Sequence, residues 1–233
     1  FEICQTRIMA GDTFKGYFER FGPIYRWIAT LTVVSASITT VLSATIVNVA
    51  VPQVMGSFGI GLDQVQWMAT AFLATMTVSQ LLSAWLLDCL GTRTTFVTML
   101  VLFAVGAVLG AAAPNIEVMA IGRAMQGMAA GVVQPLSMVV LVLVFPPERR
   151  GFAMGIYGMG VVLAPAIGPL VGGIAIDTLG WRYMFLIPLP MCALALLAGT
   201  HFLPGREAEH RPRPFDWLGV VLLALSLVAI LAV

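Results

Sequence analysis

Arg123 is a charged residue inside a long apolar stretch of the sequence, and Gln126 follows it by three residues. If this stretch crosses a membrane, the charge costs about 2.5–3.5 kcal/mol on insertion scales and must be turned away from lipid. In one interpretation Arg123 faces a wet central cavity, where it would organise a proton or substrate site with Gln126 on an adjacent face. In the other, its long side chain reaches the headgroups near Glu117.

Two further stretches place polar or helix-breaking residues in apolar surroundings. Thr45 and Asn48 interrupt the run that ends at Pro52. A buried Asn there would make an interhelical hydrogen bond, and contact with a ligand is the alternative. A later stretch is rich in glycine and proline, and its candidate residues are Gly158, Pro165, Gly168, Pro169, Gly172 and Gly173. In a membrane these residue types permit close helix packing, and the two prolines also favour a bent helix.

The composition places these residues in a membrane protein. Hydrophobic residues make up 60% of the 233 residues and charged residues only 10%, against about 25% charged in soluble domains. So few charges cannot cover a water-exposed surface, which excludes a soluble globule and a disordered chain. The net charge of +1 excludes a nucleic-acid binder. The three cysteines lack paired spacing, so we expect no disulfide framework, no metal and no cofactor.

The elements that must position the candidate residues are membrane-spanning helices, which need about 20 mostly apolar residues. Segments of this kind fill residues 27–51, 65–87, 96–113, 118–145, 152–176, 183–202 and 217–233. We therefore expect an all-α polytopic membrane helix bundle.

The same segments divide the chain into four parts. These are an amino-terminal arm (1–26), a six-helix bundle (27–202), a polar linker (203–216) and the start of a seventh helix (217–233). The arm is either a short helix on the membrane surface or a tethered segment. Because the chain begins without Met and stops in an apolar run, we expect a fragment of a longer protein.

The basic residues indicate which face of the bundle is cytoplasmic. Of the 12 Lys and Arg residues, Arg123 lies within a predicted helix and Arg182 follows the fifth; all the others share one face. Loops rich in Lys and Arg stay in the cytoplasm. We therefore expect a multi-pass protein of a cell membrane, inner or plasma, with a cytoplasmic amino terminus and Asp63, Glu117 and Asp177 outside.

A short pattern occurs twice along the chain. The pattern Asp-x-Leu-Gly-x-Arg fills residues 88–93 and again residues 177–182. Each copy lies between the second and third helix of a three-helix group, so the first copy falls inside and the second outside. This placement is typical of the 3+3 inverted repeat of secondary transporters.

The first copy places Asp88, Gly91 and Arg93 in a tight cytoplasmic turn. In one interpretation Asp88 offsets the dipole of the third helix and Arg93 anchors at headgroups. In the other, Asp88 pairs with a group on a second half of the protein and locks one face of the transporter shut. The two interpretations are compatible.

These stretches, in this order, resemble the motifs of the major facilitator superfamily. Residues 42–52 resemble the first-helix motif of its fourteen-helix drug:proton antiporter family, and residues 84–93 resemble the superfamily's loop motif. Residues 123–131 resemble the fourth-helix motif, whose arginine is linked to proton coupling. Residues 158–173 resemble the fifth-helix antiporter motif, which is associated with export, and residues 215–219 resemble the start of a seventh helix. The resemblance implies the six-helix amino-terminal half of a major-facilitator fold.

The sequence departs from these motifs at four positions. Ser43 stands where the family often has an aspartate, which removes a candidate proton carrier from the first helix. Ala84, Cys89 and Thr92 replace a glycine and two basic residues of the loop motif. The proton stoichiometry and the strength of any conformational lock are therefore left open.

The residues and the resemblance together predict a secondary active transporter that exports drugs or small amphipathic metabolites by proton antiport through alternating access. Its partners would be the solute, protons, the bilayer and the missing carboxy-terminal half of the chain. An uptake permease for a small organic solute is the alternative. A membrane enzyme would show clustered His, Cys or carboxylates at membrane depth. His201 and His210 stand alone, so we expect no enzyme.

Overall fold

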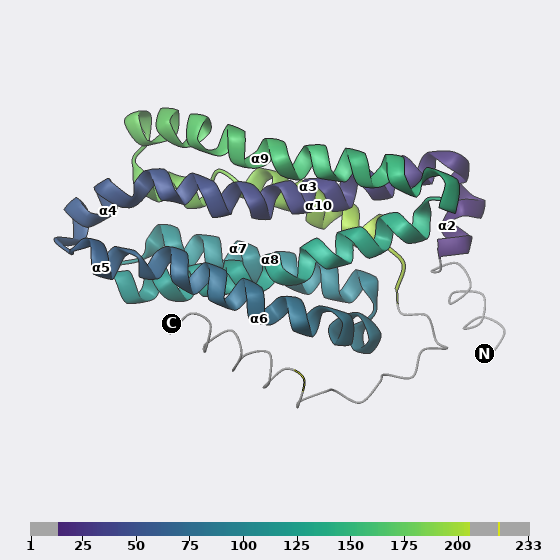
Figure 1. Cartoon of the computed structure of the whole chain (residues 1–233), viewed down its shortest axis with the longest axis horizontal. Helices are drawn as coiled ribbons and strands as arrows, with labels where there is room; N and C mark the ends of the chain where they lie inside the picture. Colours follow the sequence, from purple (N-terminus) through teal and green to yellow (C-terminus); the bar gives the residue numbers. More distant parts are fainter. Residues whose placement is uncertain (1–13, 206–218, 220–233) are drawn as a thin grey trace.

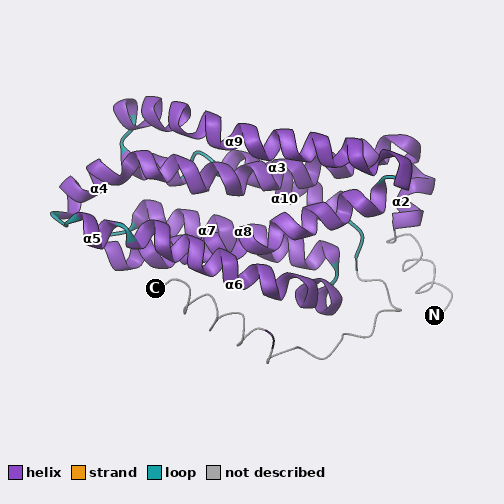
Figure 2. Ribbon diagram, viewed as in Figure 1, coloured by secondary structure: helices purple, strands orange, loops and turns teal. Residues whose placement is uncertain are grey.

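The part of the chain that the computed structural model describes, residues 14–205 and Gly219, is a bundle of long helices lying side by side (Figure 1). Residues 14–205 contain helices and short connections and no strand (Figure 2). Six helical segments within them are long and apolar enough to cross a membrane. These observations confirm the predicted all-α polytopic membrane bundle.

Most helices agree with the predicted spans to within a few residues. In chain order the elements are α2 (Phe14–Phe21), η1 (Gly22–Ile24), α3 (Tyr25–Ile46), η2 (Val47–Ala50), α4 (Val51–Phe58), α5 (Leu62–Val65), α6 (Trp67–Leu90), α7 (Thr92–Ala112), α8 (Ile116–Val144), η3 (Pro147–Arg149), α9 (Arg150–Thr178), η4 (Trp181–Phe185) and α10 (Leu189–Phe202). The polar loop over 206–218 and all of the predicted seventh helix except Gly219 lie outside the described residues. The four-part division of the chain therefore stays a prediction.

Two proline-containing segments differ from the predicted boundaries. The first span runs on through the 3-10 turn η2 into α4 and ends at Phe58, because Pro52 lies in the first turn of α4, where its missing N–H leaves no broken hydrogen bond. The predicted sixth helix is divided into η4 and α10. Pro188 precedes α10, and Pro190 lies in its first turn, a position that suits proline.

The two copies of the repeated pattern have the same backbone conformation. Gly91 has φ 79° and ψ 166°, and Gly180 has φ 90° and ψ 168°. Residues other than glycine rarely adopt these positive φ values. Each glycine follows the end of one long helix by one or two residues and directly precedes the next helical element. The structure thus gives both copies the same turn, as an internal repeat requires.

Helix packing also follows the inverted repeat. The second helix of each group, α6 or α9, packs against the first helix of the other group, α8 or α3. The third helices follow the same exchange, since α7 packs against α8 and α10 packs against α3. Helices α3 and α8 contact each other, as do α7 and α10. The contacts map onto themselves when the groups are exchanged, which confirms the predicted 3+3 construction.

The bundle has two ends with different charge. One end is formed by α2, the α6–α7 turn and the α8–α9 junction (Figure 1). It is called the basic end, since Arg93 lies in the first turn of α7, Arg149 in η3 and Arg150 at the start of α9. The opposite end, formed by the α4–α5, α7–α8 and α9–η4 turns, is called the acidic end and bears Asp63 and Glu117.

Candidate functional site

Arg123 is buried inside the bundle. Its side chain is 1% exposed and extends from α8 toward α3 and α6. Nε donates to the Met68 carbonyl oxygen at 3.3 Å, and Nη1 donates to the Ser43 carbonyl and Oγ, both at 3.3 Å. The Phe72 ring covers one face, with its centroid 4.2 Å from Cζ. The side chain therefore does not reach the headgroups, and that interpretation is wrong.

The charge of Arg123 has only neutral hydrogen-bond partners in the described part of the chain. Nη1 also donates to Gln126 Oε1 at 3.0 Å, so both residues predicted as a pair are in contact. Gln126 is fully buried, and its Nε2 has no hydrogen-bond partner among the described residues. A buried charge normally has an opposite charge beside it. Here the site consists of a cation and neutral polar groups.

Small residues on α8 bring the helices of this site together. A Cβ atom at Gly127 would collide with the Phe72 carbonyl oxygen of α6, and one at Gly131 would collide with the Met76 carbonyl oxygen. On another face, a Cβ at Gly122 would lie 2.7 Å from the Gly106 carbonyl oxygen of α7. Close approach of this kind is the usual role of glycine between membrane helices. It brings α6 and α7 close against α8 around Arg123.

Only some of the candidate glycines and prolines of helix α9 lie in close contact with a neighbouring helix. A Cβ at Gly168 would collide with Thr45, and one at Gly172 would lie 3.1 Å from Ile46 Cγ1. The equivalent positions at Gly158 and Gly173 are open. Pro165 and Pro169 are exposed, and α9 is assigned as one unbroken helix.

Thr45 and Asn48 have different environments. Thr45 Oγ1 donates back to the Leu42 carbonyl oxygen at 3.2 Å, within its own helix, and lies against Gly168. Asn48 is exposed on η2 and lines a cavity of about 160 Å³ together with Arg123 and Gln66. Asn48 therefore lines this small cavity and Thr45 packs against α9; contact of Asn48 with a ligand stays a prediction.

At the basic end, Arg93 joins three segments. Its Nε donates to the Leu203 carbonyl oxygen at 2.7 Å, and its Nη2 donates to the Tyr17 hydroxyl at 2.6 Å. The guanidinium of Arg93 thus binds groups of the protein, and its anchoring at headgroups stays a prediction. Asp88 is half-buried near this turn, and its gating role stays a prediction.

The aromatic segment of the arm is a helix packed on the bundle. The Tyr17 ring stacks on the Tyr25 ring at 5.3 Å, and the Phe21 ring meets Phe202 edge-on at 5.7 Å. Tyr25 donates its hydroxyl to the Phe202 carbonyl oxygen at 2.9 Å. Of the two predicted forms of the arm, a helix is present in the described residues, and its aromatic side contacts the protein.

We expect Tyr17→Phe to loosen α2 without unfolding the bundle, because it removes a hydrogen bond to a guanidinium but keeps the stacked ring. Such a bond contributes about 1.5–3 kcal/mol. Hydrogen exchange of the α2 amides in full-length protein should become faster by about tenfold or more. Tyr183→Phe is the matched control, since Tyr183 is 48% exposed at the other end; equal exchange in both variants would contradict the contact's importance.

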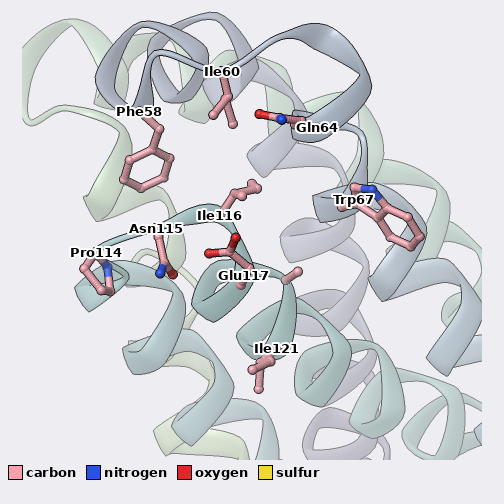
Figure 3. Close-up of a pocket in the computed structure, with 10 residues that line it drawn as sticks. Phe58, Ile60, Gln64, Trp67, Pro114, Asn115, Ile116, Glu117 and Ile121 are labelled. Atoms are coloured by element: carbon pink, nitrogen blue, oxygen red, sulfur yellow. The ribbon is translucent and has the colours of Figure 1, made fainter.

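A pocket of about 660 Å³ lies at the acidic end between the α4–α5 region and the start of α8 (Figure 3). Figure 3 shows Phe58, Ile60 and Trp67 on one side and Ile116 and Ile121 on the other. Among the described residues that line the pocket, Glu117 is the one that is charged, and Gln64 contributes an amide. The walls are suited to an amphipathic molecule. This pocket is called the terminal pocket below.

Sequence reasoning did not find the partners of Arg123 on α6. Met68 acts through its backbone carbonyl, which any residue type would supply. Phe72 is one of 13 phenylalanines, and its spacing from Arg123 carries no periodic signal. Ser43 was visible only as a departure from a family motif. These contacts cross between helices, so one sequence alone could not assign them.

A bundle of six membrane-crossing helices built from an inverted repeat, with a buried cation between its helices, defines a polytopic membrane protein of the secondary-transporter class. Residues 33–232 match the family model described as "Major Facilitator Superfamily". The chain belongs to the major facilitator superfamily.

Some of the relatives carry names that describe them as exporters. The chain is 35% identical over 211 residues to "Multidrug export protein EmrB" of Haemophilus influenzae, covering 89% of this chain and 41% of the relative. It is 32% identical over 200 residues to "Probable multidrug resistance protein EmrY" of Escherichia coli, covering 86% and 39%. An uncharacterized MFS-type transporter of Bacillus subtilis, YhcA, is 35% identical over 191 residues, covering 82% and 36%. The chain thus spans about two fifths of the length of these relatives.

Solved structures confirm the fold. A peptide transporter matches with a TM-score of 0.68 at 18% identity, over 97% of this chain and 48% of that chain. The proton:xylose symporter XylE matches with the same TM-score at 16% identity, over 75% and 44%. At these identities the likeness shows the fold alone. All these matches are transporters, which agrees in general terms with the expectation of a non-enzymatic role.

Proposed function

We propose that this chain is the amino-terminal half of a secondary transporter that exports drugs or small amphipathic metabolites in exchange for protons. The observation that carries the proposal is Arg123, a fully buried cation that links α3, α6 and α8 through neutral partners. Intramembrane charges of this kind mark ion and substrate pathways. The names of the multidrug export relatives support export as the direction.

In this proposal Arg123 is a fixed charge and not the proton carrier. Arginine stays protonated in proteins, and Ser43 beside it cannot carry a proton at neutral pH. In this proposal the proton is therefore carried by a titratable group outside the contacts of Arg123. The guanidinium would influence that group through its field and through the helices it links.

The partner of the described bundle is proposed to be the rest of the same chain. Helices α6 and α9, which are equivalent in the inverted repeat, are the two least buried spans of the described bundle. The exposed apolar residues of α9 include Val162, Leu163, Ile167 and Leu170. A second helical bundle against these faces would create a path between the halves, and rocking of the halves would give alternating access. The basic end would lie in the cytoplasm.

The terminal pocket supports an amphipathic solute. We expect Glu117→Gln to weaken transport of a cationic dye about two- to fivefold in apparent affinity, the range for an exposed ion pair. A neutral solute should be unaffected. Asp63→Asn is the control, because Asp63 is exposed near the same end but is not among the lining residues. Concentration-dependent dye transport in vesicles gives the measurement, and equal effects of both variants would contradict this use of the pocket.

The direction of flux tests the proposal as a whole. Everted vesicles containing the full-length protein should accumulate a fluorescent drug when their interior is acidified, and collapse of the pH gradient should release it. An uptake permease would move its solute in the same direction as the protons instead. Drug movement that is indifferent to the pH gradient would contradict proton exchange.

A further inference from the structure

The cavity beside Arg123 has mostly apolar walls, to which three polar side chains contribute hydrogen-bond donors. It lies between η2, α5 and the start of α6, and its described lining residues are Val47, Asn48, Val51, Leu62, Val65, Gln66, Met68, Ala69 and Arg123. Asn48 and Gln66 are exposed, whereas Arg123 is buried. The two amides therefore lie toward the mouth of the cavity and the guanidinium toward its base.

Arg123, one of the residues that line this cavity, has hydrogen-bonding capacity left. Its Nε and Nη1 make all of its hydrogen bonds in the described part of the chain, and Nη2 makes none there. The Phe72 ring compensates part of the charge through one face of the guanidinium. A desolvated cation with a free N–H pair is costly, because both the charge and the donors are unmatched.

The charge and size of the cavity select the ligand. Of its described lining residues, Arg123 alone is charged, so the net charge of the walls is positive. Asn48 and Gln66 can each donate two N–H groups to an acceptor. A volume of about 160 Å³ equals roughly five times the share of one water in the liquid. The cavity can therefore accept a small monovalent anion with a few waters, and it excludes large ones.

We propose that this cavity is a binding site for a small inorganic anion such as chloride, which neutralises Arg123 and bridges it to Asn48 and Gln66. The site takes the place of a fixed carboxylate beside the guanidinium. It goes beyond proton-coupled export, because it assigns the protein an anion dependence of its own. Ser43 Oγ, 3.3 Å from Nη1, is where a built-in carboxylate would take over the anion's role.

The experiment measures thermal unfolding of purified full-length protein in sodium chloride and in sodium gluconate of equal ionic strength. Chloride should raise the unfolding midpoint with a saturable concentration dependence, since a ligand that binds only the folded state stabilises it. Gluconate is too large for the cavity and should not. Because no transport is measured, the result is independent of whether the protein exports drugs.

Four variants localise the effect. Gln66→Leu should raise the half-saturating chloride concentration about tenfold, the loss expected for one hydrogen bond to an ion. Gln64→Leu, two residues away on the terminal pocket, should leave it unchanged. Ser43→Asp should abolish the chloride effect. If Ser43→Asp does not fold, Asn48→Asp at the exposed rim serves the same purpose and should also abolish it.

Two results would overturn the anion site. One is a wild-type unfolding midpoint that is equal in chloride and gluconate, which would mean that water alone fills the cavity. The other is a chloride effect that keeps its wild-type concentration dependence in Gln66→Leu and in the aspartate variants, which would place the anion elsewhere.

Discussion

Replacing Arg123 with Ala in the full-length protein is expected to abolish proton-coupled drug export while the protein still inserts into the membrane. Insertion should be near normal, because the change removes a charge that is costly in a bilayer. Export should fall by about tenfold or more, since the buried hydrogen bonds of the guanidinium to α3, α6 and Gln126 are lost together. Drug accumulation in acidified everted vesicles gives the measurement.

Two further variants show whether the geometry or the charge of Arg123 matters. Lys at position 123 keeps a positive charge but cannot reproduce the planar fork of donors, so Arg123→Lys should remain impaired. Arg149→Ala is the control, because Arg149 is an exposed arginine in the η3 turn. Wild-type export by Arg123→Ala would remove this residue from the mechanism.

The second large effect is expected at Gly168, where an added methyl group would strike Thr45. Gly168→Ala should lower the thermal stability of the full-length protein, as overpacking costs about 1–3 kcal/mol. Gly173→Ala is the matched control, since it lies on the same helix with open space around its Cβ position. Both changes gain the same intrinsic helix propensity, so their difference reports the collision with α3.

A double variant checks that Thr45 is the cause. Thr45→Ala removes the Oγ1 atom nearest to the added methyl group, so it should restore part of the stability lost in Gly168→Ala. The unfolding midpoints of the two single variants and the double variant give the coupling. If Gly168→Ala and Gly173→Ala proved equally stable, the close packing of α9 on α3 would be contradicted.

The membrane bundle and its inverted repeat could be predicted because both leave local signals. Apolar length marks each span, and the pattern at 88–93 and 177–182 marks two equivalent turns, whose glycines indeed share one backbone conformation. The boundaries at η2 and α10 were less predictable. Proline occurs both after the end of a helix and in its first turn, and the residues packed around it determine which position it takes.

The contacts of the candidate site could be predicted only in part. The proximity of Arg123 and Gln126 follows from helical spacing and is present in the structure. The partners of Arg93 were not predictable, because Tyr17 and Leu203 lie far from it in sequence and meet it only through packing of the helix ends. The roles of glycines 168 and 173 differ for the same reason, since the facing helix decides which is crowded.

The most direct test of the central claim, that the fixed charge of Arg123 couples protons to solute, is proton release on drug binding. Purified full-length protein in weakly buffered detergent solution should release protons when drug is added, whereas Arg123→Gln should bind drug without releasing them. An equal number of protons released by the wild type and Arg123→Gln, at equal drug occupancy, would contradict the account.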